Sequence, residues 1–240
     1  MLQSLKRHPL RVRICVFGVV LFAVAGYLIL RTPVRMQAPS AIEYPLRGAD
    51  LSAHNSVTDW NTLAAAVDFV LLKATEGGNW NDRKFRTNYE NARAAGLKVG
   101  AYHFFRFDRE SLPQAINFFN PIWGKRLDFP AVIDVEEDGN PEDVDRDKVV
   151  ERIGQMVEFL ESHGVRVMFY ANKKSYSKYL EDRFSEYPVW ICSLSSEPDD
   201  NMNWMVWQFS HTGNLPGIKG EVDLNVFRNK KFDDEQIFVK

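Results

Sequence analysis

Apolar runs and helical segments alternate along residues 47–194, and this alternation constrains the fold more than any other feature of the chain. Runs of β-branched and aromatic residues predict strands at 47–52, 69–75, 98–105, 130–136, 165–171 and 188–194. The intervening segments predict helices at 59–67, 82–95, 112–123, 141–163 and 173–184. Gly96 and Gly164 lie where helix C-caps belong, and Pro141 suits a first helical turn. This order of elements predicts a parallel β/α barrel.

The last third of the chain predicts an irregular end to that barrel. Two more strands are expected at 204–210 and 221–227, but the connections 195–203 and 211–220 are too short, and too rich in Pro, Gly, Asn and Asp, for crossover helices. Parallel connections usually need a dozen residues or more, so at least one late strand should be antiparallel. We therefore expect an α/β, TIM-like (β/α)5(β)3 barrel domain over residues 47–240.

The N-terminal region predicts a membrane anchor. Residues 14–30 carry no charge, and the length of this run is at the short limit for a transmembrane helix. Four basic residues precede the run. The positive-inside bias then assigns 1–13 to the cytoplasm and the barrel to the periplasmic or extracellular side of the cytoplasmic membrane. The alternative is a cleaved signal peptide, because Ala23-Val24-Ala25 resembles a signal-peptidase site. Residues 31–46 contain three prolines and predict an extended linker.

Composition narrows the classes of partner. A formal net charge of -2 lacks the basic excess of a nucleic-acid binder. The two cysteines, Cys15 and Cys192, form no disulfide framework, and Cys192 is expected to be a buried apolar residue. We expect a monomer.

Asp134 and Glu136 are the first candidates for chemistry. They stand two residues apart in a predicted strand, so their side chains share one face, with Cα atoms about 6.6 Å apart. Ionising both at that spacing costs about 2.5 kcal/mol at an effective dielectric near 20, or about two pKa units on one partner. Such a pair suits acid-catalysed glycoside cleavage, whereas a strand end facing water is the structural alternative.

Polar side chains also follow the other predicted strands at their C-terminal ends, where a barrel of this class carries its working residues. Carboxylates and aromatic rings at one rim favour a carbohydrate site, since rings can stack on sugar faces. Neither His-x-Glu nor paired-His spacing surrounds His103, so we expect no metal there. The further candidates are Asp50, Lys73, Glu76, Tyr102, Tyr170, Trp190, Gln208, Asp223 and Asn225.

Six segments in order resemble glycoside hydrolase family 25, the Chalaropsis-type lysozymes or N-acetylmuramidases. They are RGADLS (47–52), FVLLKATEG (69–77), GAYHF (100–104), IDVE (133–136), WQFS (207–210) and VDLNVF (222–227). The chain departs from the family pattern at 189–194, where Cys192 and Leu194 replace an alanine and a tyrosine-containing tail.

The resemblance implies a barrel that cleaves the β-1,4 bond between N-acetylmuramic acid and N-acetylglucosamine in peptidoglycan, without metal or organic cofactor. It implies that Glu136 is the general acid and that Asp134 assists the 2-acetamido group of the substrate. Asp50 and Asp223 would position substrate or act electrostatically.

Two other functions fit the same residues. One is a chitinase-like, substrate-assisted β-N-acetylglucosaminidase, because Asp-x-Glu also occurs in such barrels. The other is a non-catalytic glycan-binding protein of the cell envelope.

Overall fold

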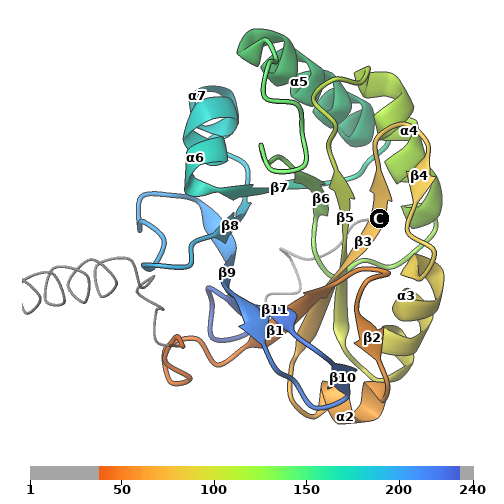
Figure 1. The fold of residues 1–240 in the computed structure, drawn as a ribbon, viewed down its shortest axis with the longest axis vertical. Helices are drawn as coiled ribbons and strands as arrows, with labels where there is room; N and C mark the ends of the chain where they lie inside the picture. Colours follow the sequence, from red (N-terminus) through yellow and green to blue (C-terminus); the bar gives the residue numbers. More distant parts are fainter. Residues whose placement is uncertain (1–37, 233–240) are drawn as a thin grey trace, which may run out of the picture. The chain divides into compact units, whose positions relative to one another are not determined.

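The structure, a computed structural model, describes residues 38–232. In this part of the chain eight strands form one closed barrel (Figure 1). The ring closes because β1 pairs with both β3 and β11. Its strands are β1 (Arg47–Leu51), β3 (Phe69–Glu76), β5 (Lys98–Phe104), β6 (Ala131–Asp134), β7 (Val167–Asn172), β8 (Val189–Cys192), β9 (Trp204–Gly213) and β11 (Val222–Phe227).

The strand directions confirm the expected irregularity. From β1 through β3, β5, β6, β7 and β8 to β9, each neighbouring pair is parallel. Strand β11 is antiparallel to both of its neighbours, β9 and β1. A short turn therefore suffices between β9 and β11, as the connection at 211–220 required.

Helical segments fill the first five connections between barrel strands. They are α2 (Trp60–Ala64), α3 (Phe85–Ala94), α4 (Ser111–Ile122), α5 (Arg146–Ser162) and the compound α6 (Lys173–Ser175), η1 (Tyr176–Leu180) and α7 (Glu181–Phe184). Helices α3 and α4 lie along the outer side of β3 and β5 (Figure 1). Gly96 and Gly164 adopt φ of 84° and 75° directly after α3 and α5, which confirms their role in the helix ends.

Two helix predictions need correction. The helix predicted at 141–163 begins only at Arg146, because the side chain of Asp145 accepts hydrogen bonds from the N–H groups of Asp147 and Lys148 and so caps that end. Pro141 lies in the preceding loop. The helix predicted at 173–184 is interrupted by a π-helical turn at 176–180.

Three short strands were not expected: β2 (Ser56–Val57), β4 (Trp80–Asn81) and β10 (Ile218–Lys219). Strand β4 extends the sheet beside β3, while β2 and β10 pair with each other.

The core has two layers, which decides where polar side chains can gather. The larger layer, including Ile133 and Val135, packs between barrel and helices. The inner layer includes Phe69, Phe129 and Phe227 and fills the barrel interior. Since successive strand residues alternate between these layers, the inward positions near the carboxyl ends of the strands remain for polar groups.

The chain enters the barrel at the amino end of β1. Before this strand, Tyr44 is buried, with its ring centroid 5.9 Å from those of Trp204 and Trp207. The predicted segments 1–13 and 14–30, the first part of the predicted linker and the last eight residues of the predicted domain lie outside the described residues. Within 38–232, no helix has the length and apolarity needed to cross a bilayer.

Candidate active site

Asp134 and Glu136 both face the barrel interior. Asp134 is the last residue of β6, and the backbone N–H of Val135 still donates to the carbonyl of Tyr170 at 2.8 Å. Since Ile133 and Val135 belong to the outer core layer, the alternating side chains of Asp134 and Glu136 point the other way. The strand thus ends two residues earlier than expected, while the predicted common face persists.

Asp134 is deeply buried, with 5% of its surface exposed. Burial, followed by the charge of Glu136, raises its pKa well above the ordinary value. Its Oδ1 atom is enclosed and has no hydrogen-bond partner among the described residues. A carboxylate oxygen in this state is an acceptor that a bound molecule could satisfy.

Glu136 is partly exposed beside it. Burial and then the nearby Asp138 raise its pKa to about 7. The loop that carries Glu136 is held by Asn140, whose Nδ2 donates to the carbonyl oxygens of Glu136 at 2.9 Å and Phe105 at 3.0 Å. Two adjacent carboxyl groups with raised pKa values retain a proton near neutral pH.

Asp50 and Asp223 form a second carboxyl pair. They stand directly opposite each other on the antiparallel strands β1 and β11. Burial, then the charge of Asp223, raises the pKa of Asp50 to about 7. Burial also raises the pKa of Asp223, to about 6. Asp50 Oδ2 accepts hydrogen bonds of 2.9 Å from both Gln208 Nε2 and Asn225 Nδ2.

Two aromatic candidates form hydrogen bonds with the amide side chains that contact Asp50. The indole N–H of Trp190 donates to Asn225 Oδ1 at 2.7 Å, and the Tyr170 hydroxyl donates to Gln208 Oε1 at 2.8 Å. Trp190 is only 2% exposed, so the ring face expected to stack on a sugar is covered. Tyr102, whose ring lies edge-on to Trp190 at 5.8 Å, is the more accessible ring.

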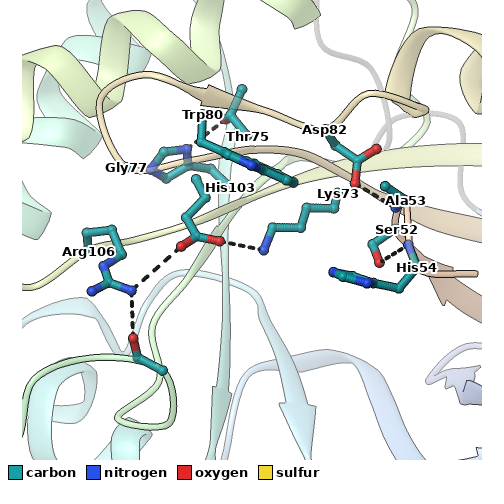
Figure 2. A network of polar contacts seen from close by, with 12 residues as sticks. Ser52, Ala53, His54, Lys73, Thr75, Gly77, Trp80, Asp82, His103 and Arg106 are labelled. Carbon is teal, nitrogen blue, oxygen red and sulfur yellow. Dashed lines mark hydrogen bonds and ion pairs between the residues drawn. The ribbon is translucent and has the colours of Figure 1, made fainter.

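Lys73 and Glu76 extend the site outward from β3. Lys73 Nζ lies 2.8 Å from Glu76 Oε2, and Arg106 Nη1 lies 3.6 Å from Glu76 Oε1. Figure 2 shows the Lys73 and Arg106 side chains reaching towards the same carboxylate, with Arg106 also donating to the carbonyl of Gly139 at 2.6 Å. The Lys73 ammonium faces the Trp80 ring, and Nζ lies 5.1 Å from the centroid of that ring (Figure 2).

A groove of about 630 Å³ adjoins this network. It is lined by the Trp80 ring, which is 41% exposed, together with Glu76, Arg106, Arg109 and Pro113. The groove thus shares Glu76 and Arg106 with this network, and it has an aromatic wall and the volume of a sugar-sized ligand.

His103 and Cys192 are not catalytic candidates. His103 is fully buried between Thr75 Oγ1, 2.7 Å from Nδ1, and Gln114 Oε1, 3.3 Å from Nε2, and burial lowers its pKa to about 3. Cys192 is buried as expected. In the part of the chain that the structure describes, no cluster of three or more His, Cys, Asp or Glu side chains could hold a metal ion.

The sequence missed Trp80, Arg106 and His211 as members of this region. Trp80 lies in a two-residue strand that has no detectable alternation, and Arg106 follows β5 among ordinary loop residues. His211 comes close to Gln208 only through an irregularity in the pairing of β9 with β11. A search for long side chains within three residues of each strand end would have found Arg106.

Comparison with known proteins identifies relatives over most of the chain. The model of the glycosyl hydrolases family 25 matches residues 49–218. The protein YegX of Escherichia coli K12 is 36% identical over 205 residues, covering 82% of this chain and 74% of that protein. An autolytic lysozyme of Clostridium acetobutylicum is 30% identical over 184 residues, covering 76% of this chain and 56% of that protein.

Solved structures show the same architecture. A family 25 glycosyl hydrolase from Bacillus anthracis superimposes with a TM-score of 0.72 at 31% identity, covering 82% of this chain and 94% of that one. A bacterial lysozyme from Streptomyces coelicolor gives a TM-score of 0.66 at 28% identity, covering 77% of this chain and 92% of that one.

Proposed function

Because this chain belongs to the glycosyl hydrolases of family 25, we propose that Glu136 is the general acid with which it cleaves peptidoglycan glycan strands. Glycoside hydrolysis and the muramidase activity of the family are the premise. The substrate bond is the β-1,4 linkage between N-acetylmuramic acid and N-acetylglucosamine. The assignment of Glu136 and its neighbours to particular steps is our own.

The unpartnered Oδ1 of Asp134 is the observation that carries this assignment. The carboxyl pair shares protons, since the pKa values of both members are raised. When the 2-acetamido N–H of the sugar donates to Oδ1, it stabilises the ionised form of Asp134. The proton then resides on Glu136, which is the member that borders the open side of the site. Substrate binding would thus create the protonated acid that the reaction needs.

The reaction then follows substrate-assisted chemistry. Glu136 gives its proton to the glycosidic oxygen as the C1–O bond breaks, and the acetamido carbonyl oxygen bonds to C1. Asp134 accepts the hydrogen bond of the acetamido N–H as positive charge develops there. Glu136, now ionised, takes a proton from water, whose oxygen bonds to C1 and releases the acetamido oxygen. Asp50 and Asp223 would position the sugar or act electrostatically.

Replacing Glu136 by Gln tests the acid role. Glu136→Gln keeps the size of the side chain but has no transferable proton, so release of reducing ends from purified cell walls should fall by about 10²-fold or more. The far-ultraviolet circular dichroism of the variant should match that of the wild type, and its thermal midpoint should be no lower, because Gln removes a carboxyl group whose pKa is raised by burial. Undiminished activity in the folded variant would remove Glu136 from the acid role.

The N-terminal segment 14–30 is proposed as an uncleaved, single-pass anchor that holds the barrel outside the cytoplasm, next to its wall substrate. The support is the uncharged apolar run with basic residues before it. The full chain should remain in the membrane fraction during alkaline carbonate extraction, and a chain lacking residues 1–30 should be released. A mature protein that starts near residue 26 would show instead that the segment is a cleaved signal peptide.

A further inference from the structure

Gln208 has every hydrogen-bonding position of its side chain engaged. Its Nε2 donates to Asp50 Oδ2 at 2.9 Å and to Asp223 Oδ2 at 3.3 Å. Its Oε1 is shared by the Tyr170 hydroxyl at 2.8 Å and by His211 Nε2 at 3.0 Å. The side chain is 1% exposed, so water has almost no access to it.

The partners of Oε1 decide which way this amide points. The oxygen and nitrogen ends of a glutamine side chain are nearly the same size, so shape alone does not select an orientation. If the amide turned over, Oε1 would face two carboxyl groups and the NH₂ group would face the donors from Tyr170 and His211. Since Oε1 can only accept, His211 must carry its proton on Nε2 in the observed arrangement.

An irregularity in β9 brings His211 to this position. Gln208 is paired with Asn225, Ser210 with Leu224 and Gly213 with Val222, so β9 contains one extra residue on each side of Ser210. With regular alternation, residue 211 would point to the opposite side of the strand from Gln208. The irregular pairing interrupts that alternation, and the 3.0 Å contact of His211 Nε2 with Gln208 Oε1 shows that the two side chains meet.

We propose that His211 is a positioning residue of the glycosidase site, whose Nε2–H holds the Gln208 amide with its NH₂ group between Asp50 and Asp223. This inference rests on the proposed function, because it presumes that the Asp50 and Asp223 pair serves glycan cleavage. His211 does not touch the reacting bond in this account. It acts through Gln208 on the geometry and protonation of the two carboxyl groups.

Four titratable groups face His211 or Gln208. Their charge states decide where the charge of His211 has an effect. Asp50 on β1 and Asp223 on β11 lie beyond the Gln208 amide, and the charge of His211 lowers the pKa of Asp50. Cys192 Sγ on β8 lies 3.4 Å from His211 Nε2, and burial raises the pKa of this thiol to about 12. Burial also raises the pKa of Tyr170 on β7. The thiol and the phenol are therefore neutral at physiological pH, and Asp50 is the group whose pKa the histidine charge lowers.

Two substitutions of His211 separate its hydrogen bond from its bulk. His211→Leu keeps a side chain of similar volume but removes the donor, whereas His211→Gln presents an amide N–H at a similar distance along the side chain. Thr212→Val changes the exposed neighbouring residue and is the matched control. The measurement is the pH profile of kcat and KM for the full chain on purified peptidoglycan, with the thermal midpoint of each variant.

For His211→Leu we expect kcat to fall by about fivefold, the effect of losing one net hydrogen bond in the site, with KM unchanged. The acid limb of the profile should move to higher pH, because the pKa of Asp50 rises when the histidine charge is removed. His211→Gln should restore kcat on the plateau. Thermal midpoints should show that both variants, like Thr212→Val, are folded at the assay temperature.

A wild-type profile in His211→Leu would overturn the inference, and so would a His211→Gln variant as slow as His211→Leu. The Glu136→Gln variant, measured alongside, distinguishes a failure of this inference from a failure of the proposed function. If Glu136→Gln is inactive and His211→Leu is normal, only the positioning role fails. If Glu136→Gln remains active, the proposed acid fails whatever the His211 variants do.

Discussion

At the scale of single residues, the site holds four carboxyl groups with raised pKa values, and burial is the largest cause at each of them. At each of them the charge of a neighbouring carboxyl group raises the pKa further. Such crowding opposes folding, because burying ionised carboxyl groups is unfavourable and the charge of Lys73 offsets only part of this at Asp134 and Glu136. The crowding lowers the free energy of unfolding, and it also leaves a glutamic acid that still carries its proton near pH 7.

Asp50 gives a measurable form of this cost. Its pKa rises from 3.8 to about 7 on folding, so between these values the folded state binds more protons and the free energy of unfolding decreases as pH rises. Asp50→Asn should therefore stabilise the domain at pH 8, by at most about 4 kcal/mol, and have much less effect at pH 4, which lies close to the unfolded-state pKa of 3.8.

Thermal unfolding at the two pH values measures this, with Asp200→Asn as the control, because the Asp200 side chain is 98% exposed. An Asp50→Asn protein that is less stable than the wild type at pH 8 would contradict the assignment of burial as the dominant effect.

Residue roles could be predicted from the sequence where strand alternation alone decides direction. Alternation in β6 is enough to put Asp134 and Glu136 on one face, and the electrostatic push between them follows from spacing. Whether a ring is exposed depends on what packs over it, so Trp190 was expected at the sugar and lies inside the barrel instead. His211 was missed because it depends on a bulge, which leaves no mark in a periodic pattern.

At the scale of elements, the barrel depends on close packing between β1 and β3 in its interior. Gly48 is paired with Phe69 across these strands, and a Cβ atom at position 48 would overlap the Phe69 ring. Phe69 is fully buried, so it has no free space into which it could move. The glycine is therefore required by its neighbour on the adjacent strand.

Gly48→Ala should destabilise the domain by about 1–3 kcal/mol, the usual cost of overpacking a full core. In a background that already contains Phe69→Leu, which leaves room for the new methyl group, the same substitution should cost less. A double-mutant cycle from denaturant unfolding gives the coupling between the two sites. Equal costs in both backgrounds would mean that the Phe69 ring is not what excludes a side chain at position 48.

Element boundaries were less predictable than the elements themselves. The eight barrel strands were expected from their apolar runs, and each is present. The start of α5 was missed because the cap at Asp145 competes with the earlier Pro141 signal, and a local hydrogen bond decides between them. The two-residue strands β2, β4 and β10 are too short for any periodicity to indicate them.

At the scale of the whole molecule, the residues that stabilise the barrel and the residues of the candidate site lie in different parts of it. Its interior is apolar around Phe69, Phe129 and Phe227, and polar at the carboxyl ends of the strands, where Asp50, Asp134 and Gln208 converge. Of the residues before β1, the described ones, 38–46, lead into the amino end of this strand. The alternation of elements in the sequence was sufficient to predict this architecture, since the carboxyl ends of parallel barrel strands always lie at one rim.

The identity of the new reducing end is the most direct test of the central claim. Purified peptidoglycan is digested with the full chain, the products are reduced with borohydride, and mass spectrometry identifies the reduced terminal sugar. A muramidase that uses Glu136 predicts reduced muramic acid in the wild-type digest and none above background with Glu136→Gln. Reduced glucosamine at the new ends would instead indicate a glucosaminidase, and saturable binding without new ends would indicate a glycan-binding protein.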